Sequence, residues 1–296
     1  MALSPNICCA GEVMIEFAAD AGGSSYHRGI AGDSFNTAVY LARAGLSVEY
    51  LTCLGDDLLS DDIMARLQEE RIGSSHIRRL ENRQPGLYVI SNDDRGERHF
   101  SYWRGQSPAR ELFDHAVELP GITDFYFTGI TLAVCRSGFE NLVGLLRQLR
   151  QRGCGVIFDP NYRVNLWENQ FQAQEYCHQV LPLCTTVLST LDDDARLWGI
   201  QDIDACREFY LGFGLQELVI KAPDLTSHAF GGGEQAVKSA RPVSALDTTG
   251  AGDSFNAGYL AARLQGKPMD VAISTAQALA ARVVQHRGAI IPGVEQ

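Results

Sequence analysis

Short apolar runs alternate with segments of helical periodicity through most of the chain. Compact apolar runs bounded by turn residues predict buried strands, whereas apolar positions three or four apart predict amphipathic helices. The expected strands are 6–11, 47–54, 125–128, 156–159, 186–189 and 217–221. The expected helices are 34–44, 60–70, 139–149, 195–198, 251–264 and 269–285. This alternation predicts an α/β fold in which helices flank a mostly parallel central sheet.

One region departs from this alternation. Two strand-like runs, 86–91 and 97–104, flank a turn at 93–96 with no helix between them, which predicts a β-hairpin. Together with the extended stretch 12–30, the hairpin is expected to form a small sheet that stands off the main domain as a lid over a cleft. We therefore expect a single domain over 1–296, with a lid formed by about 12–31 and 86–105.

The composition narrows the possible partners. The chain has 296 residues, is 45% hydrophobic and carries a formal charge of −11, so nucleic acid and anionic membranes would be repelled. No apolar run approaches the ~20 residues that span a bilayer. The eight cysteines contain no C-x-x-C pair and no signal peptide precedes them, which favours free thiols. We expect a cytoplasmic protein whose anionic ligands need a local cationic pocket.

A glycine-rich turn runs directly into one of the predicted C-terminal helices. It reads DTTGAGDS over residues 247–254. Unpaired N–H groups at a helix start, and the helix dipole, attract phosphate oxygens and the charge that develops during phosphoryl transfer. Asp253 in the first turn can accept the proton of an attacking hydroxyl. The alternative is that Asp253 and Ser254 only cap the helix and the glycines only turn the chain.

Two segments resemble the signatures of one enzyme family. The segment DTTGAGDSFNAGYLA, 247–261, resembles the C-terminal signature of the ribokinase-like, or PfkB, carbohydrate kinases. The segment GIAGDSFN, 29–36, is similar to the N-terminal signature, in which a Gly-Asp pair and an asparagine hold sugar hydroxyls. Asp33 and Asn36 lie one turn apart at a helix start, so both side chains can face one ligand. A helix cap is the alternative for Asp33.

Within this family the chain looks closest to the 2-keto-3-deoxygluconate kinases. The supporting segments are 11–16, 81–88, 96–98, 102–104, 128–133, 159–163, 166–167 and 287–292. The resemblance implies a ribokinase-like fold, a homo-oligomer, and transfer of the ATP γ-phosphate to the C6 hydroxyl of 2-keto-3-deoxy-D-gluconate. It also implies Mg²⁺ as cofactor and leaves dependence on a monovalent cation such as K⁺ open.

The resemblance further implies roles for individual residues. Asp253 would be the catalytic base, with an anion hole formed by Gly250, Ala251 and Gly252. The residues expected to bind the sugar acid are Gly32, Asp33, Asn36, Tyr88, Tyr102, Arg104, Ile130 and Arg163. The residues expected to bind the nucleotide are Ser189, Lys221, Thr248, Thr249, Gly250 and Gly252.

The two arginines would bind the carboxylate of the sugar acid. Arg163 follows the predicted strand 156–159, at the carboxyl edge where open α/β sheets bind ligands, and a guanidinium suits a bidentate carboxylate contact. Arg104 ends the predicted lid hairpin. The alternative for each arginine is an ordinary surface ion pair.

Two departures from the family pattern affect the nucleotide half. Lys221 is followed by Ala222, Pro223 and Asp224 where relatives have glycines, and proline removes an N–H group. The run 191–194 replaces the family's N-x-x-E pattern, which leaves Asp194 as a candidate metal ligand. The alternative for this acidic run is a charged first helical turn.

Two other functions compete with the sugar-acid kinase. One is a kinase of the same family for a neutral sugar such as fructose, or for a nucleoside. The other is a non-catalytic sugar-acid sensor on a kinase fold, suggested by the altered nucleotide half. The Asp253 turn argues against the sensor, because a sensor has no need of a base beside an anion hole.

Overall fold

The central element of the computed structural model is a nine-stranded sheet, and the model describes residues 6–19, 25–92 and 98–293. The strand order is β13-β12-β11-β10-β9-β8-β1-β4-β5. The parallel strands are β1 (Asn6–Ala10), β4 (Ser47–Leu54), β5 (Ile77–Arg79), β8 (Asp124–Thr128), β9 (Gly155–Asp159), β10 (Thr186–Thr190) and β11 (Glu217–Lys221). The antiparallel edge strands are β12 (Thr226–Gly231) and β13 (Glu234–Ser239).

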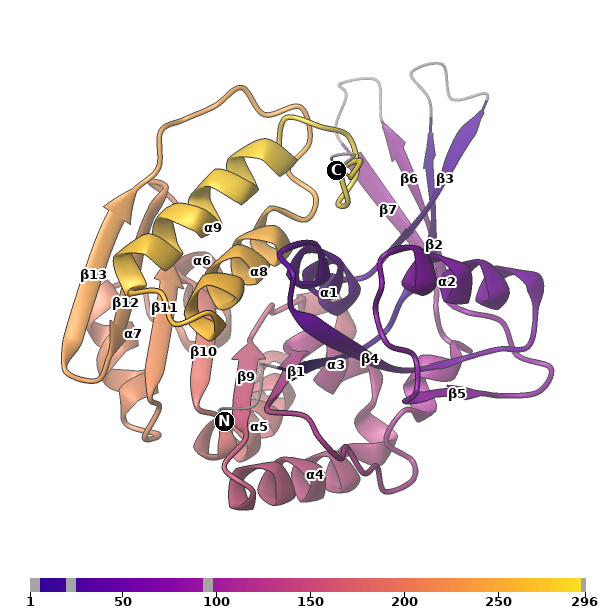
Figure 1. Cartoon of the computed structure of the whole chain (residues 1–296), viewed down its shortest axis with the longest axis horizontal. Helices are drawn as coiled ribbons and strands as arrows, with labels where there is room; N and C mark the ends of the chain where they lie inside the picture. The colour runs from indigo at the N-terminus through magenta and orange to yellow at the C-terminus, as the bar shows by residue number, and fades with distance from the viewer. Residues whose placement is uncertain (1–5, 20–24, 93–97, 294–296) are drawn as a thin grey trace.

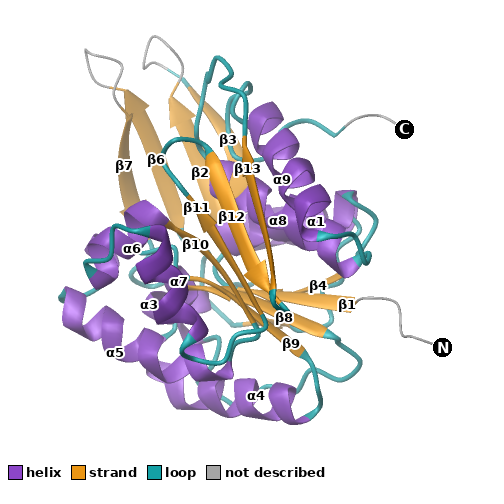
Figure 2. Ribbon diagram, turned by 90° about the vertical axis from the view of Figure 1, so that its left-hand side faces the viewer, coloured by secondary structure: helices purple, strands orange, loops and turns teal. Residues whose placement is uncertain are grey.

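Helices cover both faces of this sheet (Figure 2). One layer contains α1 (Asp33–Arg43), α2 (Leu58–Glu69), α8 (Ala251–Leu264) and α9 (Met269–Val283). The other contains α3 (Gly129–Val134), α4 (Phe139–Gln151), α5 (Gln170–Val180), α6 (Leu191–Trp198) and α7 (Ile203–Leu211). Because strand side chains alternate between faces, Phe125 and Phe127 of β8 join one core and Tyr126 joins the other.

A second, four-stranded sheet stands at the edge of the main body (Figure 1). Its strands are β3 (Tyr26–Ala31), β2 (Met14–Ala19), β6 (Leu87–Asn92) and β7 (Arg98–Trp103), in that order. The predicted small sheet is therefore present, and we call it the lid sheet. The predicted turn at 93–96, with Glu97, lies outside the described residues.

The predicted elements are present with shifts of a few residues at their ends. Three kinds of element were missed: the edge hairpin β12–β13, the short strand β5, and the helices α3, α5 and α7. The hairpin alternates polar and apolar residues only weakly, and its second strand, EQAVKS, is largely exposed. Such an edge strand has little hydrophobic signal because only one of its faces is covered.

The order of the strands places the carboxyl ends of β1, β8 and β9 at a reversal point. The chain adds β4 and β5 on one side of β1 and then β8 to β13 on the other. Open α/β sheets bind ligands outside the carboxyl ends of the strands at such a point. The segments that follow these three strands begin at Gly11, Gly129 and Pro160.

Two expectations from composition also have structural counterparts. All eight cysteines are buried and free, as expected. Among the residues that the structure describes, no helix is both long and apolar enough to cross a bilayer.

Candidate active site

The start of α8 is a left-handed glycine turn held by a buried carboxylate. Gly250 precedes the helix with φ 75°, and a Cβ there would lie 2.8 Å from atoms of Ala289. Both the left-handed backbone and this close contact require glycine. Asp247 accepts hydrogen bonds from the N–H groups of Thr249 (2.9 Å) and Gly288 (2.6 Å). The turn is thereby fixed against the C-terminal segment.

The first turn of α8 is open on its outer side. In the described part of the chain no side chain caps this helix. Gly252 is exposed, and no atom lies within 4 Å of the position that a Cβ would take there. Thr248 is exposed, and Thr249 and Ala251 are half-buried. The N–H of Ala251 donates to the carbonyl oxygen of Thr248 at 3.2 Å, whereas among the described residues the N–H groups of Gly250 and Gly252 have no such partner. These two amides can receive phosphate oxygens, so the turn fits the nucleotide phosphates expected there.

Asp253 lies in this first turn without acting as a cap. It is half-buried, and one of its oxygens accepts a hydrogen bond from Nδ2 of Asn36 at 2.8 Å. Burial, and next the charge of Asp33, raise the pKa of Asp253 to about 8, against the opposing effect of Asn36. A carboxylate that holds a proton this strongly is suited to accept one from a hydroxyl near neutral pH. In the described part of the chain neither Asp253 nor Ser254 makes the hydrogen bond of a helix cap.

Asp33 is the first residue of α1, and it does not cap that helix either. The N-cap is Gly32, where a Cβ would lie 2.2 Å from the carbonyl oxygen of Glu12. One carboxylate oxygen of Asp33 accepts a hydrogen bond from Nδ2 of Asn161 at 2.9 Å. The charges of Asp33 and Asp253 influence each other, so two residues far apart in sequence lie in one site.

Asn36 has a different partner from the one expected. It is 4% exposed, its amide nitrogen contacts Asp253, and its amide oxygen accepts from the N–H of Gly32 at 3.4 Å. The side chain therefore faces the carboxylate of Asp253, where a sugar hydroxyl had been expected.

The lid sheet contributes an aromatic surface. The rings of Tyr88 and Tyr102 lie side by side with centroids 5.5 Å apart, and Tyr102 is half exposed. The hydroxyl of Tyr88 donates to Oε2 of Glu16 at 2.5 Å. Burial raises the pKa of Tyr102, while the charges of Arg104 and Arg163 lower it. Tyr102 thus lies near both arginines.

The two arginines differ in availability. Arg104 forms an ion pair with Glu12, and the two side chains are only 13% and 1% exposed. Burial raises the pKa of Glu12, and the charge of Arg104 opposes this. Arg163 is 52% exposed, lies 3.6 Å from Asp193, and donates to the carbonyl oxygen of Tyr162. Arg163 is open to a ligand, whereas Arg104 is already paired with a protein carboxylate.

Other expected residues take a variety of positions. Ile130 lies in the first turn of α3, beside the carboxyl end of β8, and packs against the core. Lys221 points inward: its Nζ donates to Oδ1 of Asn256 at 2.7 Å and lies 5.6 Å from the Phe255 ring. The N–H of Ala222 is used by the carbonyl oxygen of Thr226 at 2.8 Å. The N–H of Ala222 is therefore not free to contact a nucleotide.

Asp194 is fully buried and has no open side. Its oxygens accept hydrogen bonds from Ser189 (2.7 Å) and Tyr210 (2.5 Å), and burial raises its pKa to about 6. Both partners are interior groups, so neither Asp194 as a metal ligand nor Ser189 as a nucleotide contact fits this geometry. The described residues gather no group of three or more potential metal ligands.

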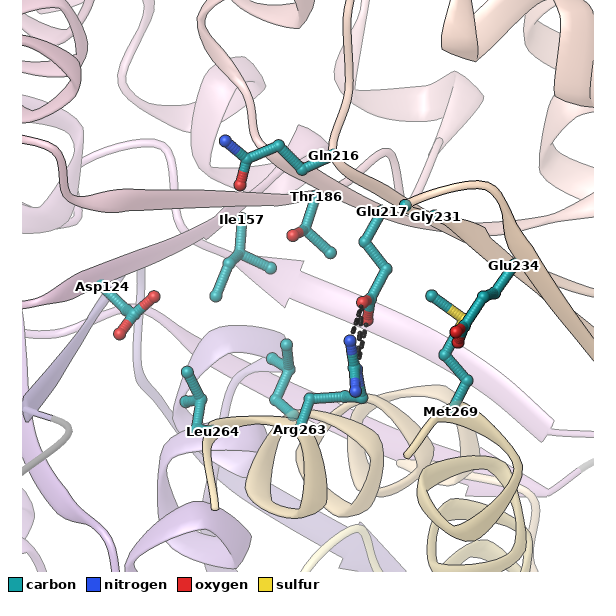
Figure 3. Close-up of a pocket in the computed structure, with 12 residues that line it drawn as sticks. Asp124, Ile157, Thr186, Gln216, Glu217, Gly231, Glu234, Arg263, Leu264 and Met269 are labelled. Carbon is teal, nitrogen blue, oxygen red and sulfur yellow. Dashed lines mark hydrogen bonds and ion pairs between the residues drawn. The ribbon is translucent and has the colours of Figure 1, made fainter. Parts of the chain in front are cut away.

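A cavity of about 470 Å³ lies at the amino ends of the central strands, and Figure 3 shows the residues that line it. It is lined by Asp124, Thr186 and Glu217, which begin strands β8, β10 and β11. Arg263 makes a bidentate ion pair with Glu217 in it. Since the amino ends of the strands form its wall, this cavity is separate from the Asp253 site.

Several residues of the site were not singled out from the sequence. Hydrogen bonds join Asn161 to Asp33 and Asn256 to Asp159. In the lid region, Glu12 pairs with Arg104 and Glu16 accepts a hydrogen bond from Tyr88. Their position just after a strand, or within a segment that matches the family, was the available signal.

Comparison with known proteins agrees with this geometry. The profile of the pfkB family of carbohydrate kinases matches residues 4–296. The 2-dehydro-3-deoxygluconokinase of Escherichia coli K12 is 38% identical over 305 residues, covering 98% of each chain. That of Dickeya dadantii is 37% identical, covering 97% of each. The crystal structure of a PfkB protein from Polaromonas sp. JS666 matches with a TM-score of 0.87 and 24% identity over 95% of this chain and 96% of that one, which confirms the ribokinase-like fold. The chain belongs to the pfkB family of carbohydrate kinases.

Proposed function

We propose that this protein is a 2-dehydro-3-deoxygluconokinase, which transfers the γ-phosphate of ATP to the C6 hydroxyl of 2-keto-3-deoxy-D-gluconate. The observation that carries the proposal is the half-buried Asp253 carboxylate, with a pKa raised to about 8, beside the open start of α8. The acceptor is inferred from the full-length relatives of that name. The open guanidinium of Arg163 supports an acceptor that carries a carboxylate.

The chemistry follows from the positions of these groups. Asp253 takes the proton of the C6 hydroxyl as its oxygen forms a bond to the γ-phosphorus. The bond between the γ-phosphorus and the bridging oxygen breaks, and ADP leaves with that oxygen. The amides of Gly250 and Gly252 stabilise the charge on the transferring phosphoryl group, with Ala251 between them sharing its N–H with Thr248. Thr248 and Thr249 flank the phosphates. When bound with ATP, Mg²⁺ would neutralise charge on the phosphates.

Sugar recognition divides between two ends of the acceptor. Asp33 accepts hydrogen bonds from sugar hydroxyls, and the backbone at Gly32 allows the sugar to approach. Arg163 holds the carboxylate from the main body, while Tyr88 and Tyr102 cover the sugar from the lid sheet. Closure of this lid excludes water, which would otherwise compete as acceptor and hydrolyse ATP.

Replacement of Arg163 by alanine tests the acceptor. Loss of a charge-assisted contact should raise the KM for 2-keto-3-deoxygluconate by about tenfold or more, with little change for a neutral sugar. Steady-state ADP release is measured with ATP, Mg²⁺ and a panel containing 2-keto-3-deoxygluconate, fructose, ribose, gluconate and adenosine. Arg147→Ala, on the exposed face of α4, is the control. Wild-type turnover on fructose alone would refute the acceptor and keep the kinase.

The pH dependence of the reaction tests the base. Because the free enzyme must have Asp253 deprotonated, kcat/KM should rise with pH and level off above the raised pKa of Asp253, about 8. Asp33 and Asp159 raise that pKa, and Asn36 and Arg163 lower it, so Arg163→Ala should move the midpoint upward. A rate profile that is flat from about pH 6 to pH 9 would argue against this assignment.

We further propose a cytoplasmic homo-oligomer, with pairing through the lid sheet. Its outer strands β3 and β7 end the sheet order, and they expose Tyr26, Phe100 and Trp103. Unpaired strand edges with apolar side chains favour association with another copy. Light scattering measures the assembly state.

The expected activation by a monovalent cation is tested by comparing ADP release in K⁺ with ADP release in Na⁺.

A further inference from the structure

Asn161 has an unusual backbone conformation at the edge of the candidate site. It follows β9, is 6% exposed, and has φ 32°, in the left-handed region that favours glycine and that asparagine tolerates. Its N–H donates to Oδ1 of Asp159 at 3.0 Å. A residue kept in this conformation and buried is held there by its surroundings.

The side chain of Asn161 reaches across to another element. Its Nδ2 donates to Oδ2 of Asp33 at 2.9 Å, joining the loop after β9 to the start of α1, 128 residues earlier. This contact occupies one oxygen of the carboxylate and leaves the other for a sugar hydroxyl. A neutral amide orients the carboxylate without the counter-charge that an arginine or lysine would bring beside Asp253.

A buried hydrogen-bond chain holds Asn161 from behind. The second oxygen of Asp159 accepts from Nδ2 of Asn256 at 2.7 Å, and Oδ1 of Asn256 accepts from Nζ of Lys221 at 2.7 Å. The charge of Lys221 lowers the pKa of Asp159, which burial raises to about 6. The inward-pointing Lys221 therefore offsets the negative charge of Asp159, the carboxylate that accepts the hydrogen bond from the N–H of Asn161. This is a structural role for Lys221 that does not involve the nucleotide.

We propose that Asn161 is a positioning residue for sugar binding, which sets the orientation of the Asp33 carboxylate through its side-chain amide. The inference rests on the proposed function in that Asp33 contacts the sugar. The same turn places Arg163 two residues later, so the two ends of the acceptor are aligned by one segment. The competing explanation is that asparagine is present only because it tolerates the left-handed backbone.

Two substitutions separate these explanations. Asn161→Gly keeps the left-handed conformation and removes only the amide, whereas Asn161→Ala removes the amide and adds backbone strain. We expect both variants to raise the KM for the sugar by about tenfold, with the KM for ATP unchanged, and only Asn161→Ala to lower Tm markedly. A purely conformational role predicts a wild-type KM for Asn161→Gly.

The chain contains a matched control. Asn82 is exposed, has φ 56°, and its N–H likewise donates to an aspartate, Oδ1 of Asp56, at 2.9 Å. Asn82→Gly makes the same chemical change at the same kind of turn, and it should leave both KM values unchanged. An equal rise of the sugar KM in this variant would overturn the inference.

The experiment distinguishes failure of this inference from failure of the proposed function. The variants are compared on whichever sugar of the panel the wild-type enzyme phosphorylates, because Asp33 would hold hydroxyls of any of them. Wild-type turnover of fructose only would refute the proposed acceptor, while the ratio of the sugar KM values would still decide the role of Asn161. A crystal structure of Asn161→Gly gives a readout independent of activity. An Asp33 carboxylate in its original orientation there would overturn the inference, and a rotated carboxylate would support it.

Discussion

Replacement of Asp253 by asparagine should lower kcat by about 10²–10⁴-fold and leave sugar binding nearly intact. The asparagine oxygen can still accept the hydrogen bond that Asn36 donates to Asp253, so the geometry of the first turn of α8 is kept. What is lost is the ability to take the proton of the attacking hydroxyl. Turnover is measured by ADP release, and sugar affinity by calorimetry.

The same substitution should stabilise the protein. The pKa of Asp253 is raised from its ordinary value of 3.8 to about 8, so between these values the folded chain retains a proton that the unfolded chain releases. Stability from this group therefore falls as pH rises through that window, and a neutral amide in place of the carboxyl removes the penalty. The Tm of Asp253→Asn should exceed that of the wild type, with a larger difference at about pH 8 than at pH 5.

A matched control and two outcomes decide the role of Asp253. Asp270 occupies the first turn of α9 and is exposed, so Asp270→Asn makes the same change at a comparable helical position. It should leave kcat unchanged. Equal losses of turnover and of sugar affinity in Asp253→Asn would show that Asp253 binds the sugar and is not the base.

Replacement of Arg104 by alanine should destabilise the protein by about 3–5 kcal/mol, because it leaves the buried Glu12 carboxylate without a counter-charge. The expected fall in Tm is on the order of 10 °C. Burial raises the pKa of Glu12, and Arg104 opposes this shift, so the variant should gain a proton at Glu12 on folding. Since a raised carboxyl pKa lowers stability as pH rises, the loss should be larger at about pH 8 than at pH 5.

A double variant separates the structural role of Arg104 from sugar binding. Glu12→Gln combined with Arg104→Met removes both charges and keeps the volume, so it should recover most of the lost Tm. A sugar KM that stays high in the stable double variant would show that Arg104 also contacts the acceptor. A single variant as stable as the wild type would contradict the buried ion pair.

The periodicity of apolar residues was sufficient for the architecture. Strands such as 156–159 are buried on both faces, and helices such as 139–149 have one apolar face, so each carries a strong local signal. The exposed hairpin β12–β13 lacks that signal and was missed. The signatures that contain Asp33 and Asp253 were also readable, because each includes a glycine that the backbone requires, Gly32 in one and Gly250 in the other.

What each polar side chain contacts was decided only by the tertiary structure. The sequence analysis expected Asn36 to contact the sugar, Arg104 to contact the carboxylate of the sugar acid, and Asp194 to bind a metal ion. In the structure they contact Asp253, Glu12 and the pair of Ser189 and Tyr210. A hydrogen bond is directional and joins residues far apart in the chain, so no local pattern reports it. The sequence alone thus determined the fold and indicated the candidate site, whereas packing decided which groups of that site remain open.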